Sequence, residues 1–369
     1  MKRILFVTAY PINNKTAGQN YTLHLLQDLN KEYVLDILYW SYKEHSPISI
    51  FENSTHYSPN PSWKTIVYSL LMNLFPLFVV RFDKQVLKHI QSIASEYDVL
   101  YFDFSQTFIY SLFVQHPCKI MMCHDVIAQK YQRTRFSYLY NWWVRYSEKK
   151  LLKTAWKILT FSSKDQQLIK TLYGLDTIVV PFYVDEKINS LDFSSLQLGN
   201  YFTFYGAWNR KENLEGLLWF LQKVLPNLSS GIKIKILGGG LKHKETIELI
   251  NQSSQVEYLG FVDNPYPIIA EARALIAPLF KGAGVKVKVI ESMAVGTPVI
   301  GTEIAFEGIE NIYINQIPAL YHAYNVQDFV DIINNFKEFT VDWKQKLHDN
   351  FLRGYSRNKF VNLLRSEIA

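Results

Sequence analysis

The residues best suited to bind a charged ligand lie in one segment of the chain, residues 278–301. An apolar run is followed there by a loop containing Gly284, and a helical pattern then carries Glu291. Backbone N–H groups of such a loop, together with the dipole of the following helix, favour a phosphate. Lys286 and Lys288 enter from the same loop, and Glu291 can accept hydrogen bonds from the vicinal hydroxyls of a sugar. An ordinary βαβ crossover with solvated lysines would have the same spacing.

A histidine follows an apolar run in the first half of the chain. His124 comes directly after residues 119–123, a predicted strand. Ligands of parallel sheets bind outside the carboxyl ends of the strands, so a neutral imidazole here could contact a bound ligand. In the alternative interpretation, Asp125 caps a helix and His124 is incidental.

Other polar residues hold comparable positions. Asp103 and Gln106 follow the apolar run at 98–103, and Gly18 and Gln19 precede or open a helical pattern. Asp103 or Gln106 could meet a ligand, although Asp103 would equally well cap a helix or a turn.

These residues need a scaffold that brings the ends of several strands together. Short apolar runs alternate with amphipathic stretches, which predicts parallel sheets covered by helices on both faces. In the first half the expected strands are residues 2–8, 34–39, 98–103, 119–123, 157–161 and 177–180, with a helix at 18–29. In the second half they are residues 201–205, 233–237, 256–259, 274–277 and 299–301, with helices at 214–224 and 287–295. We therefore expect an α/β protein of two doubly wound domains.

The composition supports a folded, two-domain chain. The 369 residues are 48% hydrophobic and 20% charged, which argues against a disordered or collagen-like protein. Two cysteines, Cys118 and Cys123, exclude a disulfide framework and a cysteine-rich zinc site. No Asp-x-Asp pair after a strand and no H-E-x-x-H motif occurs, so no metal is expected. The net charge of +6 fits anionic partners without choosing among them.

Residues 278–301 also resemble the donor-binding region of the retaining glycosyltransferases of family four, or group 1, which have the GT-B fold. That family has two glutamates eight positions apart, then a helix of small residues and a Gly-x-Pro-Val sequence. Glu291 matches the second glutamate, and residues 296–299 match the last sequence. Ala283 replaces the first glutamate, and the GAGxKxK sequence resembles a subgroup that lacks this acid.

The resemblance implies roles for residues in both halves. The implied donor-binding residues are Gly206, Arg210, Lys211, Gly238, Val262, Gly284, Lys286, Val287, Lys288 and Glu291. His124 would be catalytic, near the donor sugar. Gly18 and Gln19 would form a loop facing the donor phosphate and the acceptor, which Asp103 or Gln106 would meet. The nucleotide-diphosphate sugar is a substrate, so no cofactor is implied, and basic loops take the place of a metal.

The resemblance also implies a domain organisation and a reaction. Residues 1–188 would form a Rossmann-like acceptor-side domain and residues 199–346 a Rossmann-like nucleotide-sugar-binding domain, the two facing across a cleft. A C-terminal helix within residues 347–369 would pack back on the first domain. The implied reaction is retaining, metal-independent hexosyl transfer to a glycan or lipid-linked acceptor in bacterial surface polysaccharide synthesis.

Two rival functions stay open at this point. A catalytically silent GT-B-like partner of another glycosyltransferase is compatible with Ala283, with Ala17 in place of a loop glycine and with the unusual Arg210-Lys211 loop. A sugar-nucleotide epimerase would need an acid–base set beyond His124. No nucleic acid is expected as a partner, because no recognition motif is present.

Basic and aromatic residues interleave in residues 130–153. Such a pattern suits a bilayer headgroup region, stacking on single-stranded nucleic acid, or the aromatic face of a packed helix. The apolar run at 63–82 favours the membrane-surface interpretation. We therefore expect a cytoplasmic protein that can lie peripherally on the inner face of the cell membrane.

Overall fold

A computed structural model describes residues 1–13, 17–41, 51, 53–134, 136–355 and 357–368. The chain divides into two compact units. The first contains Met1–Pro181 and Val361–Ala369, and the second contains Phe182–Phe360.

The first unit is built around a seven-stranded sheet whose strands pair in parallel, in the order β3-β2-β1-β4-β5-β6-β7. Its strands are β1 (Arg3–Thr8), β2 (Val34–Trp40), β3 (Ser54–Tyr57), β4 (Val99–Asp103), β5 (Lys119–Cys123), β6 (Lys157–Thr160) and β7 (Ile178–Val179). Residues 4–7 of β1 have no exposed surface. Such a continuous buried run is what a parallel strand covered on both faces requires.

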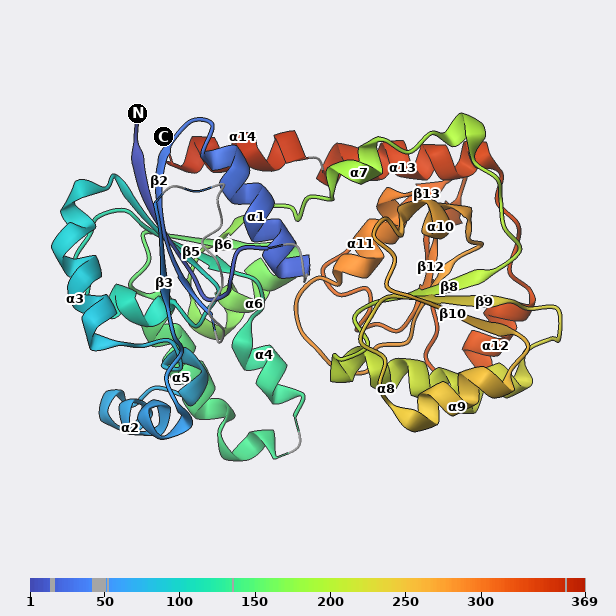
Figure 1. Ribbon diagram of the computed structural model, residues 1–369, viewed down its shortest axis with the longest axis horizontal. Coiled ribbons are helices and arrows are strands. Elements are labelled where there is room, and N and C mark those ends of the chain that lie inside the picture. The colour runs from blue at the N-terminus through green and yellow to red at the C-terminus, as the bar shows by residue number, and fades with distance from the viewer. Residues whose placement is uncertain (14–16, 42–50, 52, 135, 356, 369) are drawn as a thin grey trace. The chain divides into compact units, whose positions relative to one another are not determined.

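Helices cover both faces of this sheet. They are α1 (Ala17–Leu29), α2 (Ser62–Met72), α3 (Lys84–Ile93), α4 (Ile127–Gln132), α5 (Asn141–Leu152) and α6 (Ser163–Tyr173), with short 3-10 turns at Pro76–Phe78, Ala94–Glu96, Phe108–Leu112 and Ser137–Leu139. Apolar residues of α3, α5 and α6 join one buried cluster with the strands. Figure 1 shows α1 on the opposite side of the sheet from α3.

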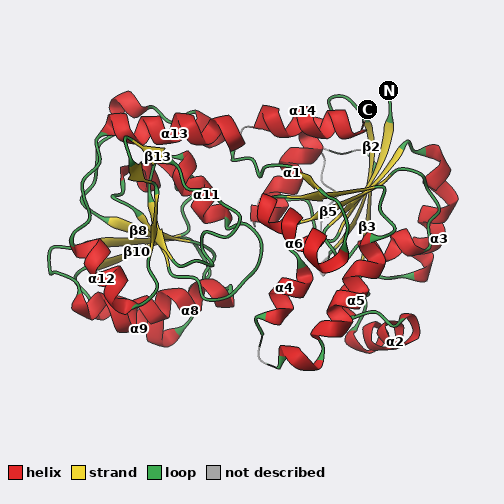
Figure 2. Ribbon diagram, turned by 180° about the vertical axis from the view of Figure 1, so that it is seen from behind, coloured by secondary structure: helices red, strands yellow, loops and turns green. Residues whose placement is uncertain are grey.

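The second unit repeats this plan with a six-stranded parallel sheet in the order β10-β9-β8-β11-β12-β15. Its strands are β8 (Phe202–Tyr205), β9 (Ile234–Leu237), β10 (Val256–Gly260), β11 (Leu275–Ala277), β12 (Val299–Gly301) and β15 (Leu320–His322), beside a small antiparallel pair, β13 (Tyr313–Ile314) and β14 (Ile317–Pro318). Its helices are α7 (Glu186–Asn189), α8 (Lys211–Trp219), α9 (Lys244–Gln252), α10 (Tyr266–Glu271), α11 (Val287–Ala294), α12 (Val326–Asn334) and α13 (Val341–Tyr355). Figure 2 shows helices around each group of strands.

The structure confirms the predicted fold class of two parallel Rossmann-like sheets. Four strands were not expected from the sequence, β3, β13, β14 and β15. Ser54–Tyr57 carries no apolar run because it lies at the sheet edge, and β15 is only three residues long. Residues 189–198, which lie between the two predicted domains, begin at the last residue of α7 and contain a 3-10 turn at Phe193–Ser195.

The chain ends in two successive helices, α13 and α14 (Arg357–Ile368). Residues up to Phe360 belong to the second unit and those from Val361 onward to the first. In the first unit Lys157 forms an ion pair with Glu367 at 2.7 Å, and Lys2 donates to the carbonyl of Ile368. No helix within the described ranges is long and apolar enough to cross a membrane.

Candidate functional site

In the second unit, Glu291 lies one turn into α11 with only part of its surface exposed. Its Oε1 atom accepts a hydrogen bond of 2.9 Å from the hydroxyl of Tyr266. Burial raises the pKa of Glu291 to about 7, while the Tyr266 hydroxyl and the charge of Lys288 oppose the rise. One carboxylate oxygen is thus fixed by a phenol, and Oε2 accepts no hydrogen bond from the described residues.

Lys288 lies almost one turn before Glu291 on the same helix. Its Nζ atom donates to Oδ1 of Asn213 at 2.7 Å, and Nδ2 of Asn213 donates to the carbonyl of Ala207. Burial lowers the pKa of Lys288 to about 7, and the charges of Arg210 and Lys286 lower it further. Three cations are therefore held close to one another, which favours an anionic ligand.

Lys286 has a different environment from Lys288. Its Nζ atom donates to the carbonyls of Ala283 and Gly284 at 3.0 and 2.6 Å, and it lies 3.9 Å from Glu307. Lys286 thus closes the loop that leads into α11 while contributing its charge to the site. Gly284 is buried in this loop with a φ of 66°.

Two glycines predicted to approach the nucleotide also approach each other. A Cβ atom on Gly238, whose φ is +114°, would lie 1.9 Å from the carbonyl oxygen of Gly206. A Cβ atom on Gly206 would lie 3.0 Å from Nζ of Lys288 and Nδ2 of Asn213. The loops after β8 and β9 therefore pack backbone to backbone beside Lys288.

The remaining predicted donor-binding residues lie at helix starts or after a strand of the same unit. Arg210 and Lys211 lie at the start of α8, both exposed, and Lys211 is 3.8 Å from Glu215. Val287 is the first residue of α11 and Val262 follows β10, both partly exposed.

Helix α11 is held in place by α13. Nζ of Lys344 is buried and donates to the carbonyls of Ala270 and Ala272 and to the hydroxyl of Thr297. Nδ1 of His348 lies 2.5 Å from the carbonyl of Ala294, the last residue of α11. These contacts fix the C-terminal end of the helix that carries Lys288 and Glu291.

In the first unit, Asp103 and His124 form a hydrogen-bonded pair at the carboxyl ends of β4 and β5. Nε2 of His124 lies 2.6 Å from Oδ1 of Asp103. Oδ2 of Asp103 accepts from the hydroxyls of Thr8 and Thr22 at 3.0 and 2.8 Å. Asp103 has no exposed surface, so its carboxylate is occupied within the unit instead of facing an acceptor.

Aromatic rings surround the imidazole of His124. The ring of Phe104 stacks on it at a centroid distance of 3.8 Å, and Tyr21 and Phe161 contact it edge-on. Phe104 has a φ of 66°, uncommon for a residue other than glycine. A Cβ atom on Gly18 would lie 3.3 Å from the Phe104 ring, so this glycine makes room for the ring.

The two predicted glutamines contact the loop after β1. Nε2 of Gln19 donates to the carbonyl of Pro11 at 2.8 Å, and Nε2 of Gln106 donates to the hydroxyl of Tyr10 at 3.0 Å. The structure thus places His124, Asp103, Gly18, Gln19 and Gln106 around the ends of three neighbouring strands, β1, β4 and β5.

Sequence reasoning missed several residues that complete these sites. They are Thr8, Thr22 and Phe104 in the first unit and Asn213, Tyr266 and Lys344 in the second. Thr8 and Phe104 adjoin strand ends, a position that could have singled them out. The other four lie within helices, where only tertiary contacts reveal them.

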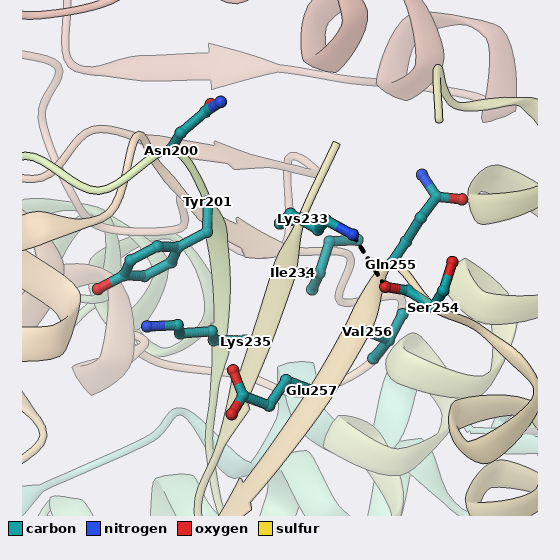
Figure 3. Close-up of a pocket in the computed structure, with 9 residues that line it drawn as sticks. All are labelled: Asn200, Tyr201, Lys233, Ile234, Lys235, Ser254, Gln255, Val256 and Glu257. Atoms are coloured by element: carbon teal, nitrogen blue, oxygen red, sulfur yellow. Dashed lines mark hydrogen bonds between the residues drawn. The ribbon is translucent and has the colours of Figure 1, made fainter. Parts of the chain in front are cut away.

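A separate cavity of about 280 Å³ lies at the amino ends of β8, β9 and β10. Figure 3 shows its lining, which includes Tyr201, Lys233, Lys235 and Glu257. Since it lies at the opposite ends of these strands from Gly206 and Gly238, it is no part of the site around Lys288. In the part of the chain that the structure describes, no group of three His, Cys, Asp or Glu side chains could hold a metal ion.

Comparison with protein families finds one match over the second unit. Residues 199–337 match the model described as glycosyl transferases group 1. The search of curated proteins found no match.

Solved structures match along the whole chain. HepE of Anabaena in complex with UDP and glucose has a TM-score of 0.71 at 13% identity, over 99% of each chain. The lipopolysaccharide outer core galactosyltransferase WaaB has a TM-score of 0.67 at 13% identity, over 98% of each chain. A variant of S. aureus TarM in complex with fondaparinux, α-GlcNAc-glycerol and UDP has a TM-score of 0.69 at 11% identity, over 100% of each chain.

Identities this low show a shared fold. The family match concerns residues 199–337 of the second unit. The chain has the GT-B fold, and its residues 199–337 match the group 1 glycosyltransferase model.

Proposed function

We propose that this protein is a retaining, metal-independent glycosyltransferase that moves a hexose from a nucleoside-diphosphate sugar to an acceptor hydroxyl. The observation that carries the proposal is the cluster of Lys288 and Glu291 on α11 with Arg210 at the start of α8. Clustered cations match a diphosphate, and a carboxylate with one free oxygen matches the hydroxyls of a ribose. The family match over residues 199–337 supports the same assignment.

The donor site performs its part by charge stabilisation. As the bond to the sugar breaks, negative charge accumulates on the leaving diphosphate, and cations that are already in place stabilise it. A positively charged Lys288 interacts more strongly with this charge because the surroundings exclude much of the water. HepE is also known in complex with UDP-glucose, so uridine nucleotides are the first donors to try.

The proposed acceptor is a glycan or a lipid-linked glycan of bacterial surface polysaccharide synthesis. WaaB, which has the same fold, is described as a lipopolysaccharide core galactosyltransferase. An unusual helix in the first unit supports the lipid part of this proposal. In α2 the buried residues are polar, Thr65 and Ser69. Its exposed apolar residues are Trp63, Ile66, Val67, Leu70 and Leu71.

A second exposed apolar group lies near α2. It consists of Phe136, Tyr138, Leu139, Trp142 and Tyr146. Helix α2 lies beside α5 in both ribbon views, and Nζ of Lys150 donates to the carbonyl of Met72 (Figure 1, Figure 2). Aromatic and aliphatic side chains next to basic ones suit the interface of an anionic bilayer, so we propose peripheral docking on the inner face of the cell membrane.

The donor site is tested by thermal shift with UDP, GDP, dTDP, CMP and ADP in the presence of EDTA. A ligand that binds only the folded state raises the apparent stability. We expect UDP to raise Tm in the wild type and in the Glu248→Ala control, an exposed glutamate on α9, but not in Glu291→Ala. The absence of a shift with every nucleotide would favour a catalytically silent partner protein.

The membrane surface is tested by sedimentation with vesicles of phosphatidylglycerol and phosphatidylethanolamine. Replacing Leu70 and Leu71 by serine should reduce binding severalfold, since it removes two exposed side chains of α2. Ile247→Ser, at an exposed apolar position of the second unit, is the matched control. Equal binding of both variants would contradict docking through α2.

A further inference from the structure

The hydrogen bonds of Asp103 determine which nitrogen of the His124 ring carries a proton. An ionised carboxylate can only accept hydrogen bonds. Both Thr8 and Thr22 direct their hydroxyls at Oδ2 of Asp103, which leaves Oδ1 for the imidazole at 2.6 Å. Nε2 of His124 must therefore donate, and a neutral ring must carry its proton on that nitrogen.

The other ring nitrogen of His124 is then an acceptor. Within the described residues, no side chain or backbone group forms a hydrogen bond with Nδ1. The His124 side chain keeps 13% of its surface exposed while Asp103 keeps none, so the imidazole is the accessible member of the pair.

Packing fixes the plane of the imidazole as well as its proton. Phe104 stacks on one face with an interplanar angle of 11°, and the rings of Tyr21 and Phe161 stand nearly perpendicular to it. Phe104 holds this position with a positive φ of 66°, a strained conformation for a residue other than glycine. Such strain persists where surrounding contacts impose it. Here the strained backbone holds the Phe104 ring against the face of the His124 imidazole.

We propose that Asp103 is the positioning residue of His124. It holds the imidazole in the tautomer with the proton on Nε2, so that Nδ1 accepts a hydrogen bond from a hydroxyl of the bound sugar. This inference rests on the proposed function and changes the predicted role of Asp103 from acceptor contact to orientation of the catalytic candidate.

The tautomer is measured directly by two-bond ¹H–¹⁵N correlation of histidine-labelled protein. The chain has nine histidines, and His124→Gln assigns the signal of interest. We expect the His124 signal of the unliganded wild type to show protonation at Nε2. Protonation at Nδ1, or an even mixture of tautomers, would overturn the inference. Because the measurement uses the wild-type protein, it does not depend on whether an Asp103 variant folds.

Kinetics then separate positioning from a merely structural role. Asp103→Asn should mix the tautomers and lower kcat by about 10–100-fold, with the donor KM changed less than threefold. Asp176→Asn, at an exposed aspartate of the same unit that pairs with Lys170, is the control, and its His124 tautomer and kcat should stay close to those of the wild type. Loss of kcat in Asp103→Asn with the tautomer unchanged would contradict positioning.

The outcomes distinguish this inference from the proposed function. If no nucleotide binds and no sugar is transferred, the proposed function fails, whatever the tautomer of His124. If donor binds and turns over but the wild-type tautomer carries its proton on Nδ1, only the role of Asp103 fails.

Discussion

The two strand-end sites contain charged groups that are satisfied in different ways. In the first unit, Asp103 is completely buried and both of its oxygens are hydrogen-bonded. In the second unit, Lys288 and Glu291 are partly exposed and each has a pKa of about 7 because of burial. No ion pair joins these two side chains within the described residues.

This difference indicates that the two sites respond differently to a ligand. The first site is preorganised, since its charge is compensated before any ligand arrives. The second site holds cations that burial and mutual repulsion destabilise. A diphosphate would relieve that repulsion, so the second site should gain stability on binding while the first should change little.

The largest effect is expected from Lys288→Met. It removes a cation that we place beside the donor diphosphate, and kcat/KM should fall on the order of 10²–10³-fold. Steady-state sugar transfer measures this, with Lys244→Met on α9 as the control. Turnover within threefold of the wild type would show that Lys288 does not act on the leaving group.

The same variant should make the unliganded protein more stable. Replacing a desolvated, repelled charge by a side chain of similar length should raise the free energy of unfolding by about 1–2 kcal/mol near pH 7. Urea unfolding without nucleotide measures the change. A large loss of stability would instead mean that the hydrogen bond to Asn213 outweighs the cost of burial.

Gly238→Ala should be the most damaging glycine substitution of the second site. Its Cβ atom would overlap the carbonyl of Gly206 at a φ of +114°, so we expect a loss of about 3 kcal/mol or more. Gly18→Ala brings a Cβ only to 3.3 Å from the edge of the Phe104 ring and should cost about 1 kcal/mol or less. Equal losses in thermal unfolding would contradict this contrast.

Donor binding should depend on pH around neutrality. As pH rises above about 7, the unliganded protein loses the proton of Lys288, so an anionic donor must bind with proton uptake and its affinity falls. As pH falls below about 7, Glu291 becomes protonated and its carboxylate accepts hydroxyl hydrogen bonds less well. Calorimetric titration between pH 5.5 and 8.5 should give weaker affinity at both ends, and a flat profile in Lys288→Met above pH 7.

Stability should follow the same two groups with opposite signs. The depressed pKa of Lys288 makes the folded state more stable as pH rises above about 7, since the unfolded state binds more protons there. The raised pKa of Glu291 makes stability fall as pH rises from its ordinary value of 4.5 toward about 7. Glu291→Gln should remove the fall in stability between pH 5 and 7. An unchanged dependence of the unfolding free energy on pH in this variant would show that Glu291 does not cause the fall.

The smallest effect is expected from Thr22→Val in the first site. It removes one of three hydrogen bonds to Asp103, which should cost about 1 kcal/mol of unfolding free energy. Urea unfolding measures the change, and a loss several times larger would mean that the carboxylate depends on both hydroxyls together.

Much of the fold was predictable because parallel strands are apolar along their whole length. Most predicted strands match observed ones within about two residues, as with residues 119–123 and β5. The edge strand β3 escaped prediction because its sequence, STHY, contacts the core through few residues. Helix α2 likewise breaks the usual pattern, since most of its apolar residues are exposed while its buried residues are polar.

The sequence by itself determined which residue types follow which strands, and the order of those strands along the chain. The two-sheet fold and the grouping of His124 with Asp103, or of Lys288 with Glu291, follow from local periodicity and from sequence proximity to strand ends. Local patterns are set by interactions over a few residues, which a sequence displays directly.

Only the tertiary structure decided what each side chain contacts. Asp103 meets Thr22 from 81 positions away, and Lys288 meets Asn213 from 75 positions away. Gly238 is required because a distant backbone, that of Gly206, passes 1.9 Å from where its Cβ would be. Hydrogen bonding and burial depend on distances in space, so the roles of these residues emerge only when the chain is folded.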